Sequence, residues 1–353
     1  MSKNQITGFS KICIAFLLLG TLIGFVTAVP STLAAQETET KKQIDQITFA
    51  SEDNKLDVKI GDELFTTFDY GTYAKPIFYP IYGPGQIGMT RNWPMKKSVQ
   101  GEQHDHVHHK SMWISHEING VHFWTEKGGS VKTTLVEFNG KTIGEKTTAE
   151  ESIFDEANAF RATSKWIRES DSKILLTDRT TYRIGFDETS RWIDCTIEYR
   201  ATHGQFQFDD TKEGLFAIRT HPDLRLTAKP AKGVSKVFGN AINSEGESGK
   251  GIWGKPAKWL LYFGTIDDTK MSVAMYDHPS NLRHPTTWHA RDYGLVTANP
   301  FGMHHFLGKE KGAGAFVVKD GETLTLRYRV DFIKGNPAVE DIEKRFENFA
   351  AQK

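Results

Sequence analysis

The sequence predicts an all-β protein, a large antiparallel β-sandwich followed by a C-terminal helix. Glycine occurs 31 times and aromatic residues make up 12% of the chain, a bias toward turns and strands. Several segments alternate apolar and polar residues and are bounded by Gly, Asp, Asn or Ser, as in half-buried strands. A βαβ rhythm and a glycine-rich phosphate loop are absent from the sequence, which disfavours a doubly wound nucleotide-binding fold.

Charge and composition narrow the classes of function. The 353 residues contain 44 Lys and Arg and 44 Asp and Glu, so the formal net charge is zero. Nucleic-acid binding needs a basic excess to neutralise phosphates, so we expect no nucleic-acid partner. With 38% hydrophobic and 25% charged residues, the composition is that of a globular protein with a sizeable core.

The N-terminus predicts export. Lys3 and Lys11 precede an apolar stretch over residues 12–29, typical of a signal peptide covering residues 1–35 with cleavage near 28 or 35. The alternative is an uncleaved anchor, because the stretch approaches the length that spans a bilayer. Residues 36–46 are polar and predict a flexible linker, and residues 47–353 predict a single β-sandwich domain. We therefore expect a periplasmic or secreted protein that makes no membrane contact once the signal is removed.

Cysteine usage agrees with this setting. Cys13 lies in the apolar stretch, so Cys195 is the single Cys of the predicted mature chain and an internal disulfide is not expected. Core burial must then supply the stability, and a bacterial periplasm is the natural compartment. Cys195 sits in an alternating run, which favours a small buried packing residue over a nucleophile.

The strands follow in order along the chain. Alternation predicts strands over Val131–Phe138, Lys173–Ile184, Arg191–Arg200 and Leu324–Phe332. Asp320-Gly321 predicts a hairpin between residues 315–319 and 323–330, because Gly tolerates the positive φ of a tight reversal.

The last element is a helix. Asn336-Pro337 provides a capping residue followed by a residue suited to the first turn. Val339, Ile342, Phe346 and Phe349 fall on one stripe, which favours a helix packed on a sheet over a partner-binding surface.

A histidine cluster is the first candidate for chemistry. Six of the 13 His fall between His104 and His122. On a strand, His104, His106 and His108 would share one face and Asp105 and His109 the other. Three imidazoles on one face are suited to a transition metal, and one or two His beside a polar substrate are suited to acid/base work. A solvated His-rich loop is the third possibility.

Aromatic and polar residues surround this cluster. Trp113, Asn119 and Trp124 follow it and Arg91 precedes it. A sugar offers an apolar CH face to an aromatic ring and hydroxyl groups to Arg, Asn and His, so this mixture is typical of a sugar site. Each Trp taken singly is more often a core residue.

Two later segments have the same character. Glu213 and Arg219 are six residues apart, which places them on one face of a strand over residues 212–219; the pair is either functional or a structural ion pair. Asp277, His278, His289 and Arg291 lie in a loop interrupted by Pro, and such loops often carry function. We expect residues 106–109 and 288–291 to converge on one concave sheet.

Several motifs resemble the PmoA family, which is labelled "methane oxygenase PmoA" and is also described as a domain of unknown function. The matching stretches are His106–Trp113, Asn119–Trp124, Glu213–Arg219, Asp277–Asn281 and Trp288–Gly302. The chain departs from the family at Lys110-Ser111, where members usually have Arg-Gly. A membrane methane monooxygenase needs several spanning helices, and this sequence has at most one apolar segment, so the label does not describe its function.

The resemblance also extends to a superfamily. PmoA proteins are similar to the galactose-mutarotase-like β-sandwiches, which include aldose epimerases and other carbohydrate-active enzymes. It implies the supersandwich form of the predicted fold, with Arg91 as a substrate-gripping residue and His108 or His109 as a catalytic one.

We therefore predict an exported protein that acts on a sugar or keto-sugar by acid/base catalysis, as an isomerase or lyase. The acid is His108 or His109 and the base is Glu213 or His289. The predicted substrate-binding residues are Arg91, Trp113, Asn119, Trp124, Arg219, Asp277, His278 and Arg291. No cofactor is expected, although a divalent metal is possible. The alternatives are a non-catalytic glycan-binding module and a cupin-like or oxygenase-like metal enzyme built on His104, His106 and His108.

Overall fold

The computed structural model describes residues 46–97, 99–138, 141–142, 156–227, 234 and 236–352. The predicted signal peptide and nearly all of the predicted linker lie outside the described residues. Within the described part, no helix is both long and apolar enough to cross a lipid bilayer. The described strands form three antiparallel sheets of eight, nine and four strands.

The eight-stranded sheet carries most of the site described below. Its strands, in spatial order, are β1 (Ile47–Glu52), β2 (Lys55–Ile60), β3 (Glu63–Asp69), β4 (Ile77–Ile81), β5 (Met112–Ser115), β14 (Leu215–Arg219), β19 (Leu295–Asn299) and β18 (Thr287–Trp288).

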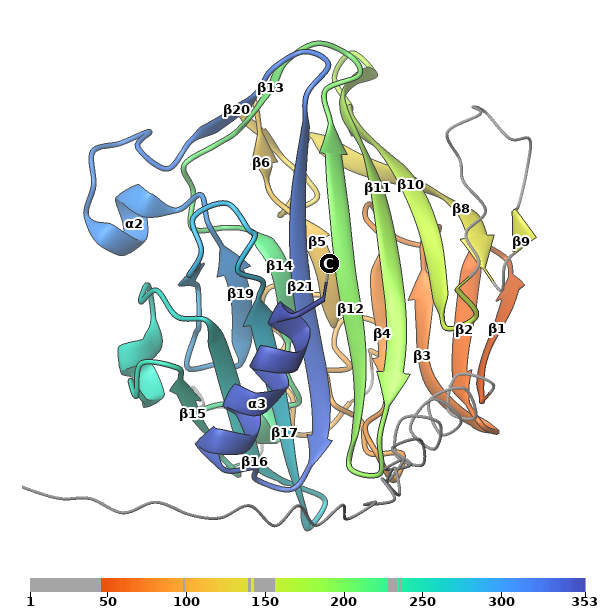
Figure 1. The fold of residues 1–353 in the computed structure, drawn as a ribbon, viewed down its shortest axis with the longest axis vertical. Helices are drawn as coiled ribbons and strands as arrows, with labels where there is room; N and C mark the ends of the chain where they lie inside the picture. The colour runs from red at the N-terminus through yellow and green to blue at the C-terminus, as the bar shows by residue number, and fades with distance from the viewer. Residues whose placement is uncertain are drawn as a thin grey trace, which may run out of the picture. The chain divides into compact units, whose positions relative to one another are not determined.

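The nine-stranded sheet contains the longest strands, which run the height of the molecule in Figure 1. In spatial order they are β15 (Asn240–Asn243), β16 (Trp259–Ile266), β17 (Thr269–Asp277), β21 (Thr323–Lys334), β12 (Ser190–Arg200), β11 (Lys173–Phe186), β10 (Ala159–Arg168), β8 (Gly129–Phe138) and β9 (Lys141–Thr142). The four-stranded sheet has the order β20 (Phe316–Val318), β13 (Phe206–Phe208), β6 (Glu117–Ile118) and β7 (Val121–His122).

The two large sheets pack face to face around an aromatic-rich core. Phe65 of β3 contacts Phe332 of β21 with ring centroids 6.0 Å apart, and Phe68 of β3 contacts Tyr182 of β11 at 5.3 Å. Side chains that alternate inward from both sheets fill the space between them, as in a β-sandwich. The predicted all-β sandwich is therefore confirmed.

The four strands predicted from alternation are confirmed as β8, β11, β12 and β21. The predicted hairpin is wrong. Phe316–Val318 pairs with β13 in the small sheet, whereas Thr323–Lys334 pairs with β12 and β17 in the large one. Gly321 does adopt a positive φ of 79°, and the turn redirects the chain from one sheet to the other. Cys195 on β12 is buried, and burial raises the pKa of its thiol.

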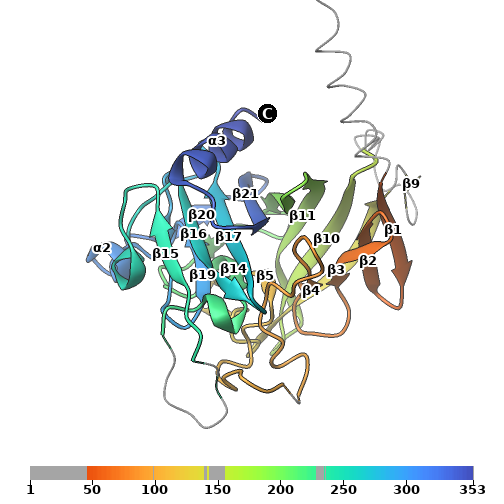
Figure 2. The same ribbon diagram turned by 90° about the horizontal axis from the view of Figure 1, so that it is seen from below.

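The C-terminal helix α3 (Val339–Ala350) covers the outer face of the nine-stranded sheet (Figures 1 and 2). Its buried residues Ile342, Phe346 and Phe349 pack in one cluster with Trp259 and Tyr276, which confirms the predicted apolar stripe. The helix begins two residues after Asn336-Pro337. Its N-terminal flanking residue is Ala338, whose backbone N–H donates to the Asp341 carboxylate at 3.3 Å, so Asn336 is not the cap. Two short 3-10 turns, Pro222–Leu224 and Gly249–Ile252, and helix α2 (Met303–Leu307) complete the described elements.

Candidate functional site

The candidate site lies on the outer face of the eight-stranded sheet, around β14. On this strand Phe216 and Ile218 belong to the core between the sheets, whereas Ala217 packs with Trp113 in a separate cluster. Arg219 shares the Ala217 face because side chains alternate along a strand. In Figure 2 the connection from β4 to β5 extends on the side of the sheets away from α3.

A polar cavity of about 430 Å³ lies here. The β4–β5 connection contributes Gln103, Asp105 and His106, and the segment before β14 contributes Lys212 and Glu213. The turn between β18 and β19 contributes His289, Arg291, Asp292 and Tyr293, and Thr227 completes the wall. The expected convergence of the 106–109 and 288–291 stretches is therefore present in the structure.

Asp105 is fixed by two buried guanidinium groups. Its Oδ1 accepts hydrogen bonds from Arg91 at 2.5 Å and from Arg219 at 3.1 Å. Burial opposes ionisation of the carboxyl, but the hydrogen bond from His106 and the charges of the two arginines outweigh it and hold the pKa of Asp105 well below its usual range. Asp105 is therefore a permanent carboxylate and not a proton donor at neutral pH.

Arg91 and Arg219 are placed behind the cavity wall rather than in it. Arg91 also donates to the carbonyl oxygens of His106 at 3.0 Å and His109 at 3.2 Å, and only 1% of it is exposed. It thereby fixes the path of the β4–β5 connection. The predicted substrate-gripping role is replaced by a structural one, because both terminal nitrogens of the buried guanidinium are engaged within the protein.

His106 is the imidazole of the cluster that reaches the cavity. Its Nδ1 lies 3.1 Å from Asp105 Oδ2, and 38% of its side chain is exposed. Its ring stacks on His109, with centroids 4.7 Å apart, and on Tyr293, with centroids 5.1 Å apart. The carboxylate selects the tautomer with a proton on Nδ1 and fixes the orientation of the ring, an arrangement suited to proton transfer.

His108 and His109, the predicted acids, do not line this cavity. His109 is 1% exposed, and Arg219 donates to its Nδ1 at 3.2 Å. Burial and the Arg219 charge lower the pKa of His109 well below its usual value. Burial also lowers the pKa of His108, to about 4. Both rings are therefore neutral at physiological pH. The His109 ring stacks on the His106 ring and so helps to fix its position.

His289 and Glu213, the predicted bases, line the cavity together. His289 Nδ1 donates to the Lys212 carbonyl at 2.8 Å, which joins the turn after β18 to the residue before Glu213. His289 Nε2 is consequently the acceptor nitrogen, and it is buried without a hydrogen-bond partner among the described residues. Burial lowers the pKa of His289 to about 3. Glu213 is one-third exposed and lies 3.3 Å from Lys212 Nζ.

Glu213 is not on the strand that the sequence predicts for residues 212–219. The strand β14 begins at Leu215, and Glu213 lies in the bend that precedes it. The bend is close-packed, because a Cβ on Gly214 would lie 1.8 Å from His116 Nδ1. Glu213 and Arg219 therefore do not share a strand face. Glu213 lines the cavity together with His289, which bonds to the carbonyl of the preceding residue, Lys212.

The predicted aromatic platforms are buried. Trp113 and Trp124 are each 1% exposed and pack with Ile77, Ala217 and Leu295. They form a floor under the His rings, with Trp113 stacked 5.5 Å from His109. Neither indole is available to a sugar. Tyr293 lines the cavity, and His106, Arg219 and Arg291 lie over its ring.

Three further predicted residues lie outside the cavity. Asn119 accepts from the Gln207 backbone at 2.9 Å in the turn between β6 and β7. Asp277 is fully buried and accepts from Asn281 and from the Thr286 backbone. His278 contacts Ser280 at 2.8 Å and the Gln352 carbonyl at 3.2 Å. These contacts stabilise turns and the docking of the chain end, so we do not retain these residues as sugar ligands.

The predicted three-histidine face does not form. Residues 102–110 are a loop, in which His104 stacks on Trp93 at 4.1 Å while His106 stacks on His109. Among the described residues, no group of three or more His, Cys, Asp and Glu is arranged to hold a metal ion. The alternative based on His104, His106 and His108 thus has no geometric basis here.

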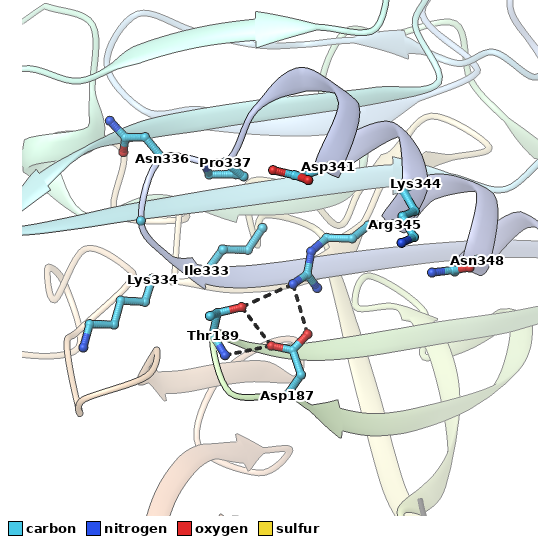
Figure 3. Close-up of a pocket in the computed structure, with 11 residues that line it drawn as sticks. Asp187, Thr189, Ile333, Lys334, Asn336, Pro337, Asp341, Lys344, Arg345 and Asn348 are labelled. Carbon is cyan, nitrogen blue, oxygen red and sulfur yellow. Dashed lines mark hydrogen bonds and ion pairs between the residues drawn. The ribbon is translucent and has the colours of Figure 1, made fainter. Parts of the chain in front are cut away.

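A larger cavity, of about 550 Å³, lies beside α3 (Figure 3). Its central group is Arg345, which donates to Asp187 at 3.0 Å and to Ser190 at 2.9 Å. Figure 3 shows the guanidinium pointing from the helix to Asp187 and Thr189. The Arg345 donors are engaged within the fold, so we interpret this cavity as the seam by which α3 is attached to the sheet.

The sequence matches one family over residues 55–347, and that family is described as a family of unknown function, DUF6807. The chain belongs to this family. The description of the DUF6807 family assigns no activity, and it does not carry the name PmoA that the motifs led us to expect. No curated protein matches the sequence.

Some solved structures are distantly similar. The galactosidase domain of the alpha-galactosidase-sucrose kinase AgaSK matches 82% of this chain and 41% of its own length, with 8% identity and a TM-score of 0.36. A Glycoside Hydrolase Family 97 enzyme from Pseudoalteromonas sp. strain K8 matches 81% of this chain and 34% of its own, with 9% identity and a TM-score of 0.31. The Slr1438 protein from Synechocystis sp. PCC 6803 matches 82% of this chain and 96% of its own length, with 10% identity and a TM-score of 0.30.

The chain thus spans well under half the length of the first two of these structures. TM-scores this low do not establish a common fold. The site of this DUF6807 member is therefore interpreted below from its own residues.

Sequence reasoning missed Asp105, Lys212 and Tyr293 as site residues. It allowed acid/base work to one or two histidines of the cluster, but it named His106 individually only as a possible metal ligand. The neighbouring pair Asp105-His106 was itself a usable signal, because a carboxylate next to an imidazole can orient it. Lys212 and Tyr293 flank residues that were selected, and nothing in the pattern separates them from ordinary surface residues.

Proposed function

We propose that this protein is an exported carbohydrate-active enzyme that transfers protons at a sugar or keto-sugar bound in the 430 Å³ cavity. The observation that carries the proposal is the meeting of a carboxylate-supported imidazole, His106, with an accessible carboxylate, Glu213, on one polar wall. The aromatic ring of Tyr293 and the guanidinium of Arg291 lie in the same wall. Pockets of this type combine a flat apolar surface with a few placed polar groups.

The residues divide the chemistry between them. His106, held by Asp105, is the acid that protonates a ring or carbonyl oxygen, and Glu213 is the base that removes a hydroxyl or α-carbon proton. His289 presents its unprotonated Nε2 as an acceptor for a sugar hydroxyl, because its Nδ1 proton is committed to the Lys212 carbonyl. His109 and Arg219 position the acid and do not contact the sugar.

One specific observation favours a second candidate, a non-catalytic glycan-binding module. Burial lowers the pKa of the cavity-lining His289 to about 3 and keeps this ring neutral, and a neutral imidazole is suited to hydrogen bonding with hydroxyl groups. A binding module needs no group that changes protonation during its work.

The test is a panel of mono- and disaccharides incubated with the protein in D₂O and followed by ¹H NMR. Anomerisation, epimerisation or a new olefinic signal identifies the reaction, and Glu213→Gln is expected to lower turnover by about 10² to 10⁴ while leaving binding largely intact. Glu188→Gln, an exposed carboxylate in the turn between β11 and β12, is the matched control and retains full turnover.

Full turnover in both Glu213→Gln and His106→Gln would contradict the catalytic assignment. Sugar binding by calorimetry without any product would favour the binding module. If no sugar in the panel is bound or converted, the proposed function is wrong.

A further inference from the structure

One cation of the cavity lining has no carboxylate partner among the described residues. Asp105 is neutralised by Arg91 and Arg219, Asp292 pairs with Lys250 at 3.1 Å, and Glu213 lies near Lys212. Arg291 lines the same cavity and forms no ion pair with a carboxylate of the described residues. Among the charged residues that line the cavity, Asp105, Glu213 and Asp292 each have a cationic partner, whereas Arg291 is engaged by no carboxylate within 4 Å in the part of the chain that the structure describes.

The guanidinium group of Arg291 is contacted on its flat face, and its N–H edge forms no ion pair among the described residues. Its guanidinium carbon lies over the Tyr293 ring, 5.4 Å from the centroid, and its backbone is fixed by an N–H bond to the Leu295 carbonyl at 2.8 Å. Stacking on an aromatic ring uses the face of a guanidinium and leaves the N–H groups in its plane available to a ligand. Those groups form a planar fork that matches a carboxylate.

A second observation points to a ligand in this wall. His289 is 2% exposed, and its Nε2 is buried without a partner among the described residues. Buried polar atoms are normally satisfied, and an orphaned acceptor that lines a cavity is commonly satisfied by a bound molecule. A sugar hydroxyl next to a carboxylate would supply the missing donor.

We propose that the sugar bound here is acidic, and that its carboxylate is held by Arg291 with Lys212 as the neighbouring cation. This inference rests on the proposed sugar site and specifies its substrate class as a uronic acid or a uronate-containing disaccharide. A neutral sugar would occupy the same volume but would leave Arg291 without an anionic partner.

The electrostatics of His289 are consistent with an anionic guest. Burial lowers its pKa first, and the positive charges of Arg291 and Lys212 lower it further. A substrate carboxylate placed between those cations would offset their effect, since an opposite charge favours the protonated form of an imidazole. Binding of an acidic sugar next to Arg291 would therefore raise the pKa of His289.

The experiment compares galacturonate with galactose by isothermal titration calorimetry at low salt, using the full chain. We expect galacturonate to bind at least about tenfold more tightly, because a hydrogen-bonded ion pair contributes more than a neutral hydrogen bond. Arg291→Gln is expected to remove most of this preference while changing the affinity for galactose less than about twofold. Arg168→Gln, an exposed arginine paired with Asp171, is the control and keeps the preference.

Galactose 6-sulfate separates the two sources of negative charge. Tighter binding of the sulfate than of the uronate would overturn the carboxylate assignment. Equal affinities for galacturonate and galactose in the wild-type protein would overturn the whole inference and leave the proposed function standing. Absence of binding by all three sugars would overturn both. The wild-type comparison needs no variant, so it decides the question even if Arg291→Gln fails to fold.

Discussion

At the scale of single residues, buried histidines connect the site to the stability of the fold. His116, between β5 and β6, is fully buried, and its Nε2–H donates to the Asp209 carbonyl at 2.8 Å. Burial lowers the pKa of His116 to about 4. Because the unfolded chain takes up a proton near pH 6.5 and the folded chain does not, His116 lowers stability as the pH falls through this window.

His116→Gln is expected to remove this pH dependence, since the Gln amide can still donate to the Asp209 carbonyl. Between pH 7 and pH 5 the wild-type protein should lose about 2 kcal/mol of unfolding free energy relative to the variant. Urea denaturation of both proteins at pH 7, 6 and 5 measures the difference. A difference that stays constant across the three pH values would show that His116 titrates normally.

The raised pKa values of two buried carboxyls act in the opposite direction. Burial raises the pKa of Asp178 and of Asp331 to about 6, so the folded state holds these protons at a pH where the unfolded chain has released them. Each carboxyl therefore adds stability as the pH falls from 6 toward 4. Comparing the wild type with the variant cancels this contribution, because both proteins contain the same carboxyls.

At the scale of elements, α3 is attached by charge as well as by its apolar stripe. Arg345 bonds Asp187 and Ser190 in the turn between β11 and β12 and lies 3.5 Å from the buried Asp331. Burial raises the pKa of Asp331, and the Arg329 and Arg345 charges partly offset that rise. Arg345 of the helix therefore partly offsets the cost of burying the Asp331 carboxylate in the sheet.

Arg345→Met is expected to lower the free energy of unfolding by about 1–3 kcal/mol, because a buried carboxylate loses a charged partner. Lys344→Met, on the same cavity wall (Figure 3), is the control and should change it by less than about 0.5 kcal/mol. Denaturant titration of the two variants gives both values. Sugar binding should be unchanged in each variant, since α3 covers the other large sheet. Equal free energies of unfolding for the two variants would show that Arg345 does not hold the helix to the sheet.

Local pattern predicted some elements well and others poorly, for a physical reason. The long strands such as Arg191–Arg200 and the stripe of α3 bury one face, and burial imposes a period that is visible in the sequence. The loop over residues 102–110 is shaped by Arg91 and by stacked rings that come from distant parts of the chain. No local periodicity records such contacts, so alternating histidines were interpreted as a strand.

The same distinction applies to the site. Glu213, His289 and Arg291 could be selected because they are polar residues in segments that looked functional. The exclusion of Trp113 and Trp124 required the fold, since only their packing in one cluster with Ile77, Ala217 and Leu295 shows that their rings are buried. The position of Glu213 also required it, because the close approach of Gly214 to His116 cannot be inferred from residue type.

At the scale of the whole molecule, three stretches that lie far apart in the sequence line one cavity. Residues 103–106 come from the β4–β5 connection, residues 212–213 precede β14, and residues 289–293 follow β18. The eight-stranded sheet brings them together by placing β5, β14, β19 and β18 side by side. Loops at one edge of a rigid sheet can change their chemistry without changing the core.

A crystal structure of the protein soaked with galacturonate tests this account most directly. We expect the sugar in the 430 Å³ cavity, with its carboxylate on Arg291 and a hydroxyl within hydrogen-bond distance of His289 Nε2. A sugar bound instead at the seam beside Arg345, or one in the cavity that contacts neither His289 nor Glu213, would contradict it.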